Sequence, residues 1–269
     1  MSPGARVVSL VPSLTEAVAV TAPGLLVGAT DWCSHPADLD VVRIGGTKNP
    51  DVAAITALGP DLVIANEEEN RAPDLAALRA AGIEVLVTEV RTLDQAFREL
   101  ERVLRACGVP DRPRWLDEAE EAWAAVETPG SGAEPGSGSG FGSGPGAGPG
   151  PGPGSGPQLT AVVPIWRRPW MVLGRDTFAG DLLARLGVRQ LYAGHTERYP
   201  RIPLDELRAA GADLVVLPDE PYRFTRDDGP EAFPGTAAAL VSGRHLTWYG
   251  PSLAEAPRVL ARELRAAHR

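Results

Sequence analysis

The side chains with the strongest potential for chemistry in this sequence are a cysteine and a histidine two residues apart, Cys33 and His35. Thiolate and imidazole are good ligands for zinc and for softer metals, so this spacing could place both on one ion. No second C-x-x-C or H-x-x-x-H accompanies them, which favours polar or packing roles over a metal site. An enzyme is an open alternative. In it, Cys33 and His195 would form a catalytic pair, or Cys33, His35, Glu68 and His195 would surround a metal.

A second group of candidates lies in the loops that follow predicted strands. Four of the six tryptophans occur there, and aromatic walls with a few polar groups are typical of a pocket for a flat, partly apolar ligand. Alternatively, a tryptophan in such a loop could pack inside its own lobe and not face a pocket. Arg167 and Arg168 could clamp a carboxylate or phosphate. The acidic run at residues 67–69 is interpreted as a solvated loop face in preference to a metal or docking surface.

The predicted ligand-binding residues come from all of these loops. They are Ser13, Leu14, Trp32, His35, Lys48, Asn49, Glu68, Trp166, Arg168, Trp170, Arg198, Tyr199, Trp248 and Tyr249.

Composition and missing motifs argue against several classes of function. A net charge of -9 and a pI near 5.0 disfavour nucleic-acid binding, which needs a basic face. G-x-S-x-G, Walker A, H-E-x-x-H and a G-x-G-x-x-G after a strand are absent, so we predict no catalytic residue. No apolar run approaches the roughly 20 residues that span a bilayer, and the first residues lack the pattern of a leader. We therefore expect a cytoplasmic monomer without membrane insertion.

Short β-rich runs alternate with helical runs, which predicts parallel sheets covered by helices on both faces. A capping box at Ser13 and Glu16 is expected to open the first helix, and Gly108 to end the fourth. Strands are predicted at residues 6–11, 25–30, 62–65, 84–87, 159–163, 188–192, 214–217 and 245–247. The other helices are predicted at residues 52–58, 73–81, 92–107, 113–126, 177–186, 204–210 and 254–267.

Two features divide the chain. Residues 129–157 contain 25 Gly, Pro or Ser among 29 positions, a composition that cannot offset its ordering entropy and predicts a flexible segment. A weak repeat relates residues 51–64 to residues 204–216, with Gly59 matching Gly211 and Asp61 matching Asp213. We therefore predict a first lobe at residues 1–111, a helix between the lobes at 112–128, the flexible segment, and a second lobe at 158–269.

Five short stretches resemble one family of proteins. They are Val8 to Glu16 (VSLVPSLTE), Leu26-Val27-Gly28 leading into Trp32 to Pro36 (WCSHP), Ile44-Gly45-Gly46, Leu58 to Ala65 (LGPDLVIA), and Pro257-Arg258. Such motifs are similar to those of the class III substrate-binding proteins of ABC transporters, also called helical-backbone metal receptors. Cobalamin-binding and iron–siderophore-binding proteins belong to that family, and the cobalamin-binding members look most similar.

The resemblance implies an α/β fold of two Rossmann-like lobes with parallel sheets, joined by a single long helix at residues 113–126. A ligand would lie in the cleft between the lobes, against Trp32, Trp166, Trp170 and Trp248. Members of the family carry a docking glutamate for the permease on each lobe, and in this chain Ala72 occupies the matching position of the first lobe. The Gly/Pro-rich segment lies where the long helix would meet the second lobe.

These observations together predict a substrate-binding protein of ABC-transporter type, without catalytic activity. Its ligand would be a metal chelate held reversibly, with cobalamin or another corrinoid first and an iron–siderophore or heme next. An ABC permease would be its second partner. The alternative is a cytosolic metallochaperone or enzyme that reuses the two-lobed fold, with a metal at Cys33 and His35.

Overall fold

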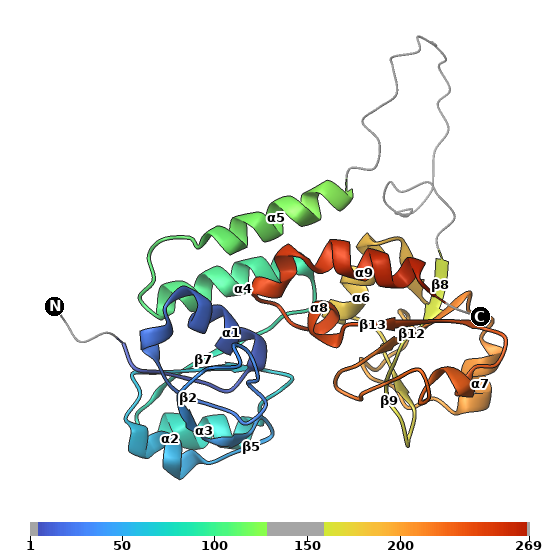
Figure 1. Cartoon of the computed structure of the whole chain (residues 1–269). Coiled ribbons are helices and arrows are strands. Elements are labelled where there is room, and N and C mark those ends of the chain that lie inside the picture. The colour runs from blue at the N-terminus through green and yellow to red at the C-terminus, as the bar shows by residue number, and fades with distance from the viewer. Residues whose placement is uncertain (1–4, 128–158, 268–269) are drawn as a thin grey trace, which may run out of the picture.

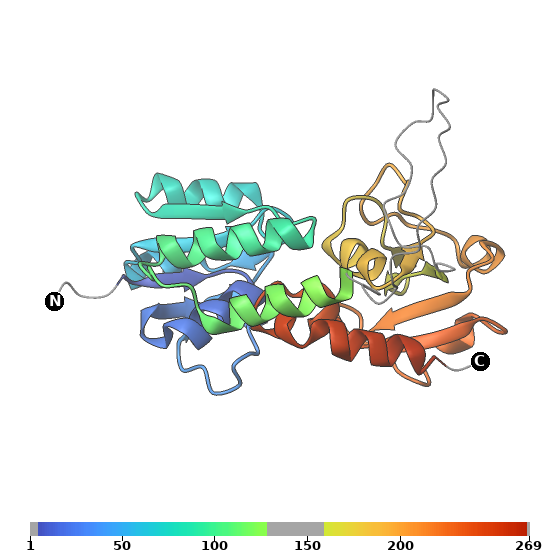
Figure 2. The same ribbon diagram turned by 90° about the horizontal axis from the view of Figure 1, so that it is seen from above.

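The structure is a computed structural model that describes residues 5–127 and 159–267. It consists of two α/β lobes side by side, with helix α5 (Arg114–Glu127) extending from the first lobe toward the second (Figures 1 and 2). The Gly/Pro-rich segment predicted at residues 129–157 falls outside the described residues. Within the described ranges, no helix is both long and apolar enough to cross a bilayer.

The first lobe is built on a five-stranded parallel sheet of order β3-β2-β1-β6-β7. Helices α1 and α4 cover one face, and α2 and α3 the other (Figure 1). Side chains alternate between these faces: Val7 and Ile64 pack toward α1 and α4, and Val8 and Val63 toward α2 and α3. The elements are β1 (Val7–Ser9), α1 (Pro12–Thr21), a 3₁₀ turn (Pro23–Leu25), β2 (Leu26–Ala29), β3 (Val42–Arg43), β4 (Gly45–Gly46), β5 (Asn49–Pro50), α2 (Val52–Leu58), β6 (Leu62–Asn66), α3 (Ala72–Ala80), β7 (Glu84–Thr88) and α4 (Leu93–Ala106).

The second lobe repeats this plan with a four-stranded parallel sheet of order β11-β8-β12-β13. Thr177 caps its helix α6 by accepting a hydrogen bond from the N–H of Gly180, as Thr92 caps α4 in the first lobe. The elements are β8 (Leu159–Val162), β9 (Pro164–Trp166), β10 (Met171–Val172), α6 (Phe178–Arg185), β11 (Val188–Gln190), α7 (Leu204–Ala209), β12 (Leu214–Pro218), a 3₁₀ turn (Pro230–Ala232), β13 (Ala237–Val241), α8 (Gly243–Thr247), a 3₁₀ turn η3 (Pro251–Ala254) and α9 (Ala256–Arg265).

The weak sequence repeat corresponds to one structural unit present in both lobes. Each copy is a helix, a glycine and a buried central strand: α2 and β6 in one lobe, α7 and β12 in the other. Gly59 and Gly211 both have a left-handed φ, +57° and +67°, which a residue with a Cβ rarely adopts. The Asp61 carboxylate accepts a hydrogen bond from the N–H of Arg6 beside β1 (2.8 Å). The Asp213 carboxylate accepts the equivalent bond from the N–H of Thr160 at the start of β8 (2.9 Å). The repeat therefore encodes the joint between neighbouring strands.

One apolar core runs through both lobes. It includes side chains from α1, α4 and α5 together with side chains from α6, α9 and the second sheet. Helix α5 is fixed at both ends: Trp115 Nε1–H donates to Thr21 Oγ1 of the first lobe (3.0 Å), and Trp123 Nε1–H donates to the Leu253 carbonyl of the second (3.1 Å). Because an apolar interface of this kind opposes relative motion, the lobes form a stiff pair.

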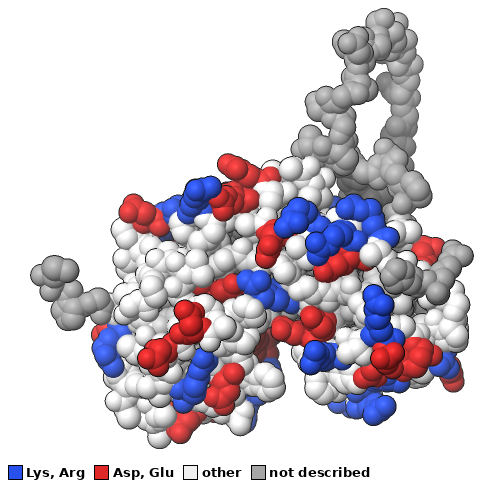
Figure 3. Space-filling view, in the orientation of Figure 1, with Lys and Arg blue, Asp and Glu red and all other residues white. Residues whose placement is uncertain are grey.

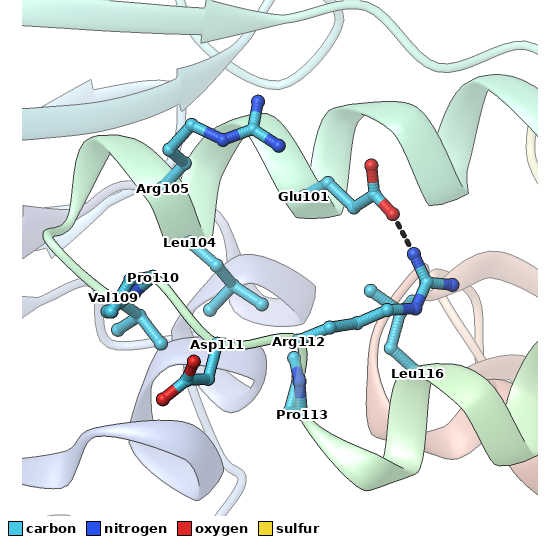
Figure 4. A pocket seen from close by; sticks show the side chains of 9 residues that line it. All are labelled: Glu101, Leu104, Arg105, Val109, Pro110, Asp111, Arg112, Pro113 and Leu116. Atoms are coloured by element: carbon cyan, nitrogen blue, oxygen red, sulfur yellow. Dashed lines mark ion pairs between the residues drawn. The ribbon is translucent and has the colours of Figure 1, made fainter.

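The turn from α4 into α5 is stabilised by charge. Arg112 forms ion pairs with Glu101, with Asp117 (2.5 Å) and with Glu120 (2.6 Å). Figure 4 shows the Arg112 side chain reaching toward Glu101 on α4, across a small cavity of about 70 Å³. This network fixes the direction in which α5 leaves the first lobe.

The predicted fold class, two lobes with parallel sheets joined by one long helix, is confirmed. Two local predictions were wrong. Helix α1 starts at Pro12 without a side-chain cap, because proline fixes φ and has no N–H to satisfy, so Ser13 is not part of a capping box. Residues 245–247 lie in helix α8, and the fourth strand of the second sheet is instead β13, whose alanines carry a weak strand signal.

Candidate functional site

A cavity of about 380 Å³ lies between the lobes and is the candidate site. Each lobe contributes residues to its wall from the loops beyond the carboxyl ends of its strands. From the first lobe these are Pro12, Ser13, Thr47, Lys48, Asn66, Glu68, Glu69 and Val90. From the second they are Ile165, Leu173, Phe178, Ala179, Tyr199, Glu220, Pro221, Thr247, Trp248 and Tyr249.

Sheet topology explains this location. In an open parallel sheet a crevice forms where the strand order reverses, since the loops on its two sides run in opposite directions. That point lies between β1 and β6 in the first lobe, and Ser13 and Glu68 follow these strands. In the second lobe it lies between β8 and β12, which are followed by Ile165 and Glu220. The two crevices face each other across one cavity.

The first-lobe wall is acidic with a single cation. Lys48 Nζ donates a hydrogen bond to the Glu68 carbonyl oxygen, which holds the ammonium against the loop. Burial raises the pKa of Glu69 to about 7, although nearby Lys48 opposes the shift. Burial also raises the pKa of Glu68, against the attraction of Arg198. Both carboxyls are therefore poorly solvated.

The second-lobe wall is aromatic, with one further carboxyl group. Trp248 Nε1–H donates to Glu220 Oε2 (2.9 Å), and burial raises the pKa of Glu220. The hydroxyls of Tyr249 and Ser13, from opposite lobes, are buried and make no hydrogen bond of good geometry with any described residue.

Ion pairs close the lobes around the cavity. Arg198 of the second lobe pairs with Glu68 and with Glu67 (3.3 Å), and the adjacent Tyr199 hydroxyl donates to Glu68 Oε2 (3.0 Å). On another side, Arg244 pairs with the buried Glu16 of α1 (Nε to Oε2, 3.4 Å). Figure 3 shows the surface hollowed between the lobes, with acidic and basic side chains beside the hollow.

Helix α6 makes a third connection between the lobes. The N–H of Leu93 donates to Asp181 Oδ2 (2.9 Å), and Arg185 pairs with Asp94 (3.1 Å). The backbones of the two lobes also approach each other closely, since a Cβ on Gly250 would lie 2.9 Å from the Ser13 carbonyl oxygen. The dimensions of the cavity are therefore set by packing as well as by charge.

The raised pKa of Glu69 leads to a test of the site's electrostatics. Because folding raises this pKa from 4.5 to about 7, the ionised carboxylate opposes folding. The cost is absent below about pH 4.5, grows between pH 4.5 and 7, and is complete above pH 7. Glu69→Gln should therefore raise the free energy of unfolding by about 2–3 kcal/mol at pH 8 and by much less at pH 5, measured with urea.

Glu84→Gln is the matched control for that experiment, since Glu84 is exposed at the start of β7, away from the cavity. An equal gain at both pH values from Glu69→Gln would contradict the assigned pKa.

The structure brings six of the predicted ligand-binding residues to the cavity wall and places the others elsewhere. The six are Ser13, Lys48, Glu68, Tyr199, Trp248 and Tyr249. Arg198 lies just behind the wall, paired with Glu67 and Glu68, and the His35 ring makes an edge contact with Trp248 (5.4 Å between centroids). The interpretation of residues 67–69 as a solvated face was wrong, because Glu68 and Glu69 line the cavity.

The remaining predicted residues do not line the cavity. Leu14 is fully buried in the core, and Trp170 packs against Phe224 and Phe233 within the second lobe. Trp32 and Trp166 are 68% and 42% exposed. Asn49 and Arg168 are exposed. Of the four tryptophans predicted to form the walls, Trp248 alone does so.

The environment of Cys33 is that of a packed thiol. Its Sγ is fully buried and lies 3.0 Å from Thr15 Oγ1 and 3.2 Å from Thr30 Oγ1. Burial raises the pKa of the thiol, whereas a cysteine nucleophile needs it lowered. Nδ1 of the predicted co-ligand His35 contacts Ser34 Oγ (3.1 Å). Over residues 5–127 and 159–267, no three or more His, Cys, Asp or Glu side chains are grouped to hold a metal ion.

Sequence reasoning missed other parts of the wall. Glu69 and Glu220 stood in loops already assigned to the cleft, but nothing in the sequence separated them from their acidic neighbours. Phe178 and Ala179 follow the cap of α6, and the start of a helix next to the cleft was the available signal.

Comparison with known proteins agrees with this geometry. No protein-family model matches the chain. Over 111 residues the chain is 29% identical to the vitamin B12-binding protein of Vibrio cholerae, a match that covers 40% of each chain. Over 107 residues it is 32% identical to an uncharacterized ABC transporter substrate-binding lipoprotein of Bacillus subtilis, covering 38% of this chain and 34% of that one. The matched stretches thus span well under half of these relatives.

Solved structures extend the likeness to the whole chain. The periplasmic heme-binding protein of Roseiflexus sp. RS-1 has a TM-score of 0.72 at 20% identity, covering 97% of this chain and 98% of that one. The periplasmic vitamin B12 binding protein of Vibrio cholerae has a TM-score of 0.66 at 15% identity, covering 98% and 97%. The fold is that of the periplasmic heme- and vitamin B12-binding proteins. The resemblance to class III substrate-binding proteins indicated by the sequence motifs is confirmed.

The relatives named above carry the names of binding proteins, two of them periplasmic and one a lipoprotein. The cytoplasmic location expected from the sequence therefore has no support among them, and neither has the cytosolic metallochaperone or enzyme.

Proposed function

We propose that this chain is a substrate-binding protein that captures a metal chelate reversibly in the cavity between its lobes. The observation that carries the proposal is the cavity itself, placed where the crevices of two parallel sheets face each other and lined by both lobes. Its volume of about 380 Å³ lies in the range of about 300–1,000 Å³ typical of small-molecule sites.

The wall has the composition that such a ligand needs. Leu173, Phe178 and Trp248 offer apolar and aromatic surface for a flat ring system. A small number of polar groups, among them Lys48, Glu69 and Glu220, would fix its orientation. Nothing in this arrangement requires turnover, so the role is capture and release.

A corrinoid is the first candidate ligand, with heme and an iron–siderophore next. The sequence relative from Vibrio cholerae is named for vitamin B12, and one structural neighbour is named for the same ligand. An ABC permease is the proposed partner, because another relative is named as the substrate-binding lipoprotein of such a transporter. The chain would then act outside the cytoplasm.

Trp248→Ala tests the proposal. Calorimetric titration of the purified chain with cyanocobalamin, hemin and a ferric trihydroxamate should give one bound chelate per chain for at least one of them. Removing the buried indole should weaken that binding about 30-fold or more, since a buried aromatic anchor contributes about 2 kcal/mol or more. Trp32→Ala is the control, because Trp32 is 68% exposed and outside the wall. Failure of all three compounds to bind would contradict the proposed function.

A further inference from the structure

The charges on the cavity wall are unbalanced. Three carboxyl groups line it, Glu68 and Glu69 from the first lobe and Glu220 from the second, against one ammonium group, Lys48. Lys48 Nζ is held by the Glu68 carbonyl oxygen. When ionised, the wall therefore carries an excess of negative charge inside a partly desolvated space, where Coulomb interactions are stronger than in water.

Arginines close to the cavity correct only part of this excess. Arg198 is paired with Glu67 and Glu68, so it offsets the charge of Glu68, and Arg244 is paired with the buried Glu16. Neither arginine belongs to the wall of the cavity. A carboxylate on a bound ligand would thus meet the like charges of Glu69 and Glu220, with Lys48 as the one cation of the wall.

The hydrogen-bonding groups point the same way. The carboxylates of Glu69 and Glu220 can accept hydrogen bonds when they are ionised. A primary amide or a cation on the ligand can donate to them. A ligand carboxylate has no proton to donate and would meet them as a like charge.

We propose that Glu69 and Glu220 make this cavity selective for chelates whose peripheral groups are amides or cations, and that they exclude chelates whose peripheral groups are carboxylates. This specificity rests on the proposed function, since it assumes that a chelate occupies the cavity. It makes these two side chains determinants of ligand choice through charge, independently of the shape of the ring.

Matched ligand pairs isolate charge from shape. Dicyanocobinamide and dicyanocobyrinic acid share a corrin ring but carry amides and carboxylates respectively, and hemin dimethyl ester and hemin share a porphyrin. At pH 8, where Glu69 is ionised, each compound is titrated into the full chain. The uncharged or amide member of whichever pair binds should bind at least tenfold more tightly than its carboxylate partner.

Charge-neutral variants identify the source of the selectivity. In Glu69→Gln and in Glu220→Gln the affinity ratio of the pair should fall at least threefold, whereas Glu84→Gln, outside the cavity, should leave it unchanged. Equal affinities of the two members in the wild-type chain, or a ratio that neither cavity variant alters, would overturn the inference while leaving the proposed function intact. If none of the four compounds binds, the inference is overturned; if cyanocobalamin and the ferric trihydroxamate also fail to bind, the proposed function is contradicted as well.

Discussion

Replacement of Trp123 by alanine is expected to lower the free energy of unfolding by about 3–5 kcal/mol, the range for truncating a large buried aromatic residue. Trp123 is 1% exposed and belongs to the core that runs through both lobes. Its indole N–H donates to the Leu253 carbonyl, so the variant also loses a hydrogen bond between α5 and the second lobe. Urea unfolding followed by circular dichroism measures the loss.

Trp166→Ala provides the control for that experiment, because Trp166 is 42% exposed and lies on the β9–β10 hairpin. It should cost no more than about 1 kcal/mol, as surface substitutions usually do. If Trp123→Ala cost as little as Trp166→Ala, α5 would not join the lobes in the way the structure describes.

Arg244→Met is expected to cost a similar amount, about 3–5 kcal/mol, for a different reason. Glu16 is 4% exposed, and Arg244 is its ion-pair partner across the lobes. Removing the guanidinium leaves a buried carboxylate without its counter-charge, and this is the situation in which a buried pair is most costly to break. Thermal melting at neutral pH measures the effect.

A double variant separates the ion pair from packing. Glu16→Leu combined with Arg244→Met removes both charges and should restore most of the lost stability, to within about 1 kcal/mol of the wild-type chain. If the destabilisation of the double variant equalled the sum of the destabilisations caused by the two single substitutions, Glu16 and Arg244 would not act as a pair.

The fold could be predicted from the sequence because local signals and the global architecture agree. Helix α2 was predicted at its observed bounds, since Asp51 caps it by accepting from the N–H of Ala54 (2.9 Å) and Gly59 ends it with a left-handed φ. The paired glycines and aspartates of the repeat marked equivalent joints in the two sheets. These features depend on neighbours in sequence or on backbone geometry, which residue type largely determines.

The sequence identified the loops that carry the site, but not the individual residues that line the cavity. Trp170 and Trp248 both lie in loops beyond strands, yet one packs against two phenylalanines and the other faces the cavity. Similarly, Glu67 and Glu69 are two positions apart, but the first pairs with Arg91 and Arg198 while the second lines the wall. Such differences depend on side chains distant in the sequence, such as Phe224 and Phe233 for Trp170 and Arg198 for Glu67, and no local pattern encodes them.

The central claim is that one chelate contacts both lobes at once, and hydrogen–deuterium exchange with and without a bound chelate tests it most directly. With cyanocobalamin at saturation, or the tightest chelate of the binding panel, amide exchange should slow together in the loops after β1 and β6, around Ser13 and Glu68, and in the second-lobe segments around Glu220 and Trp248. Protection confined to a single lobe, or located outside these segments, would contradict the account.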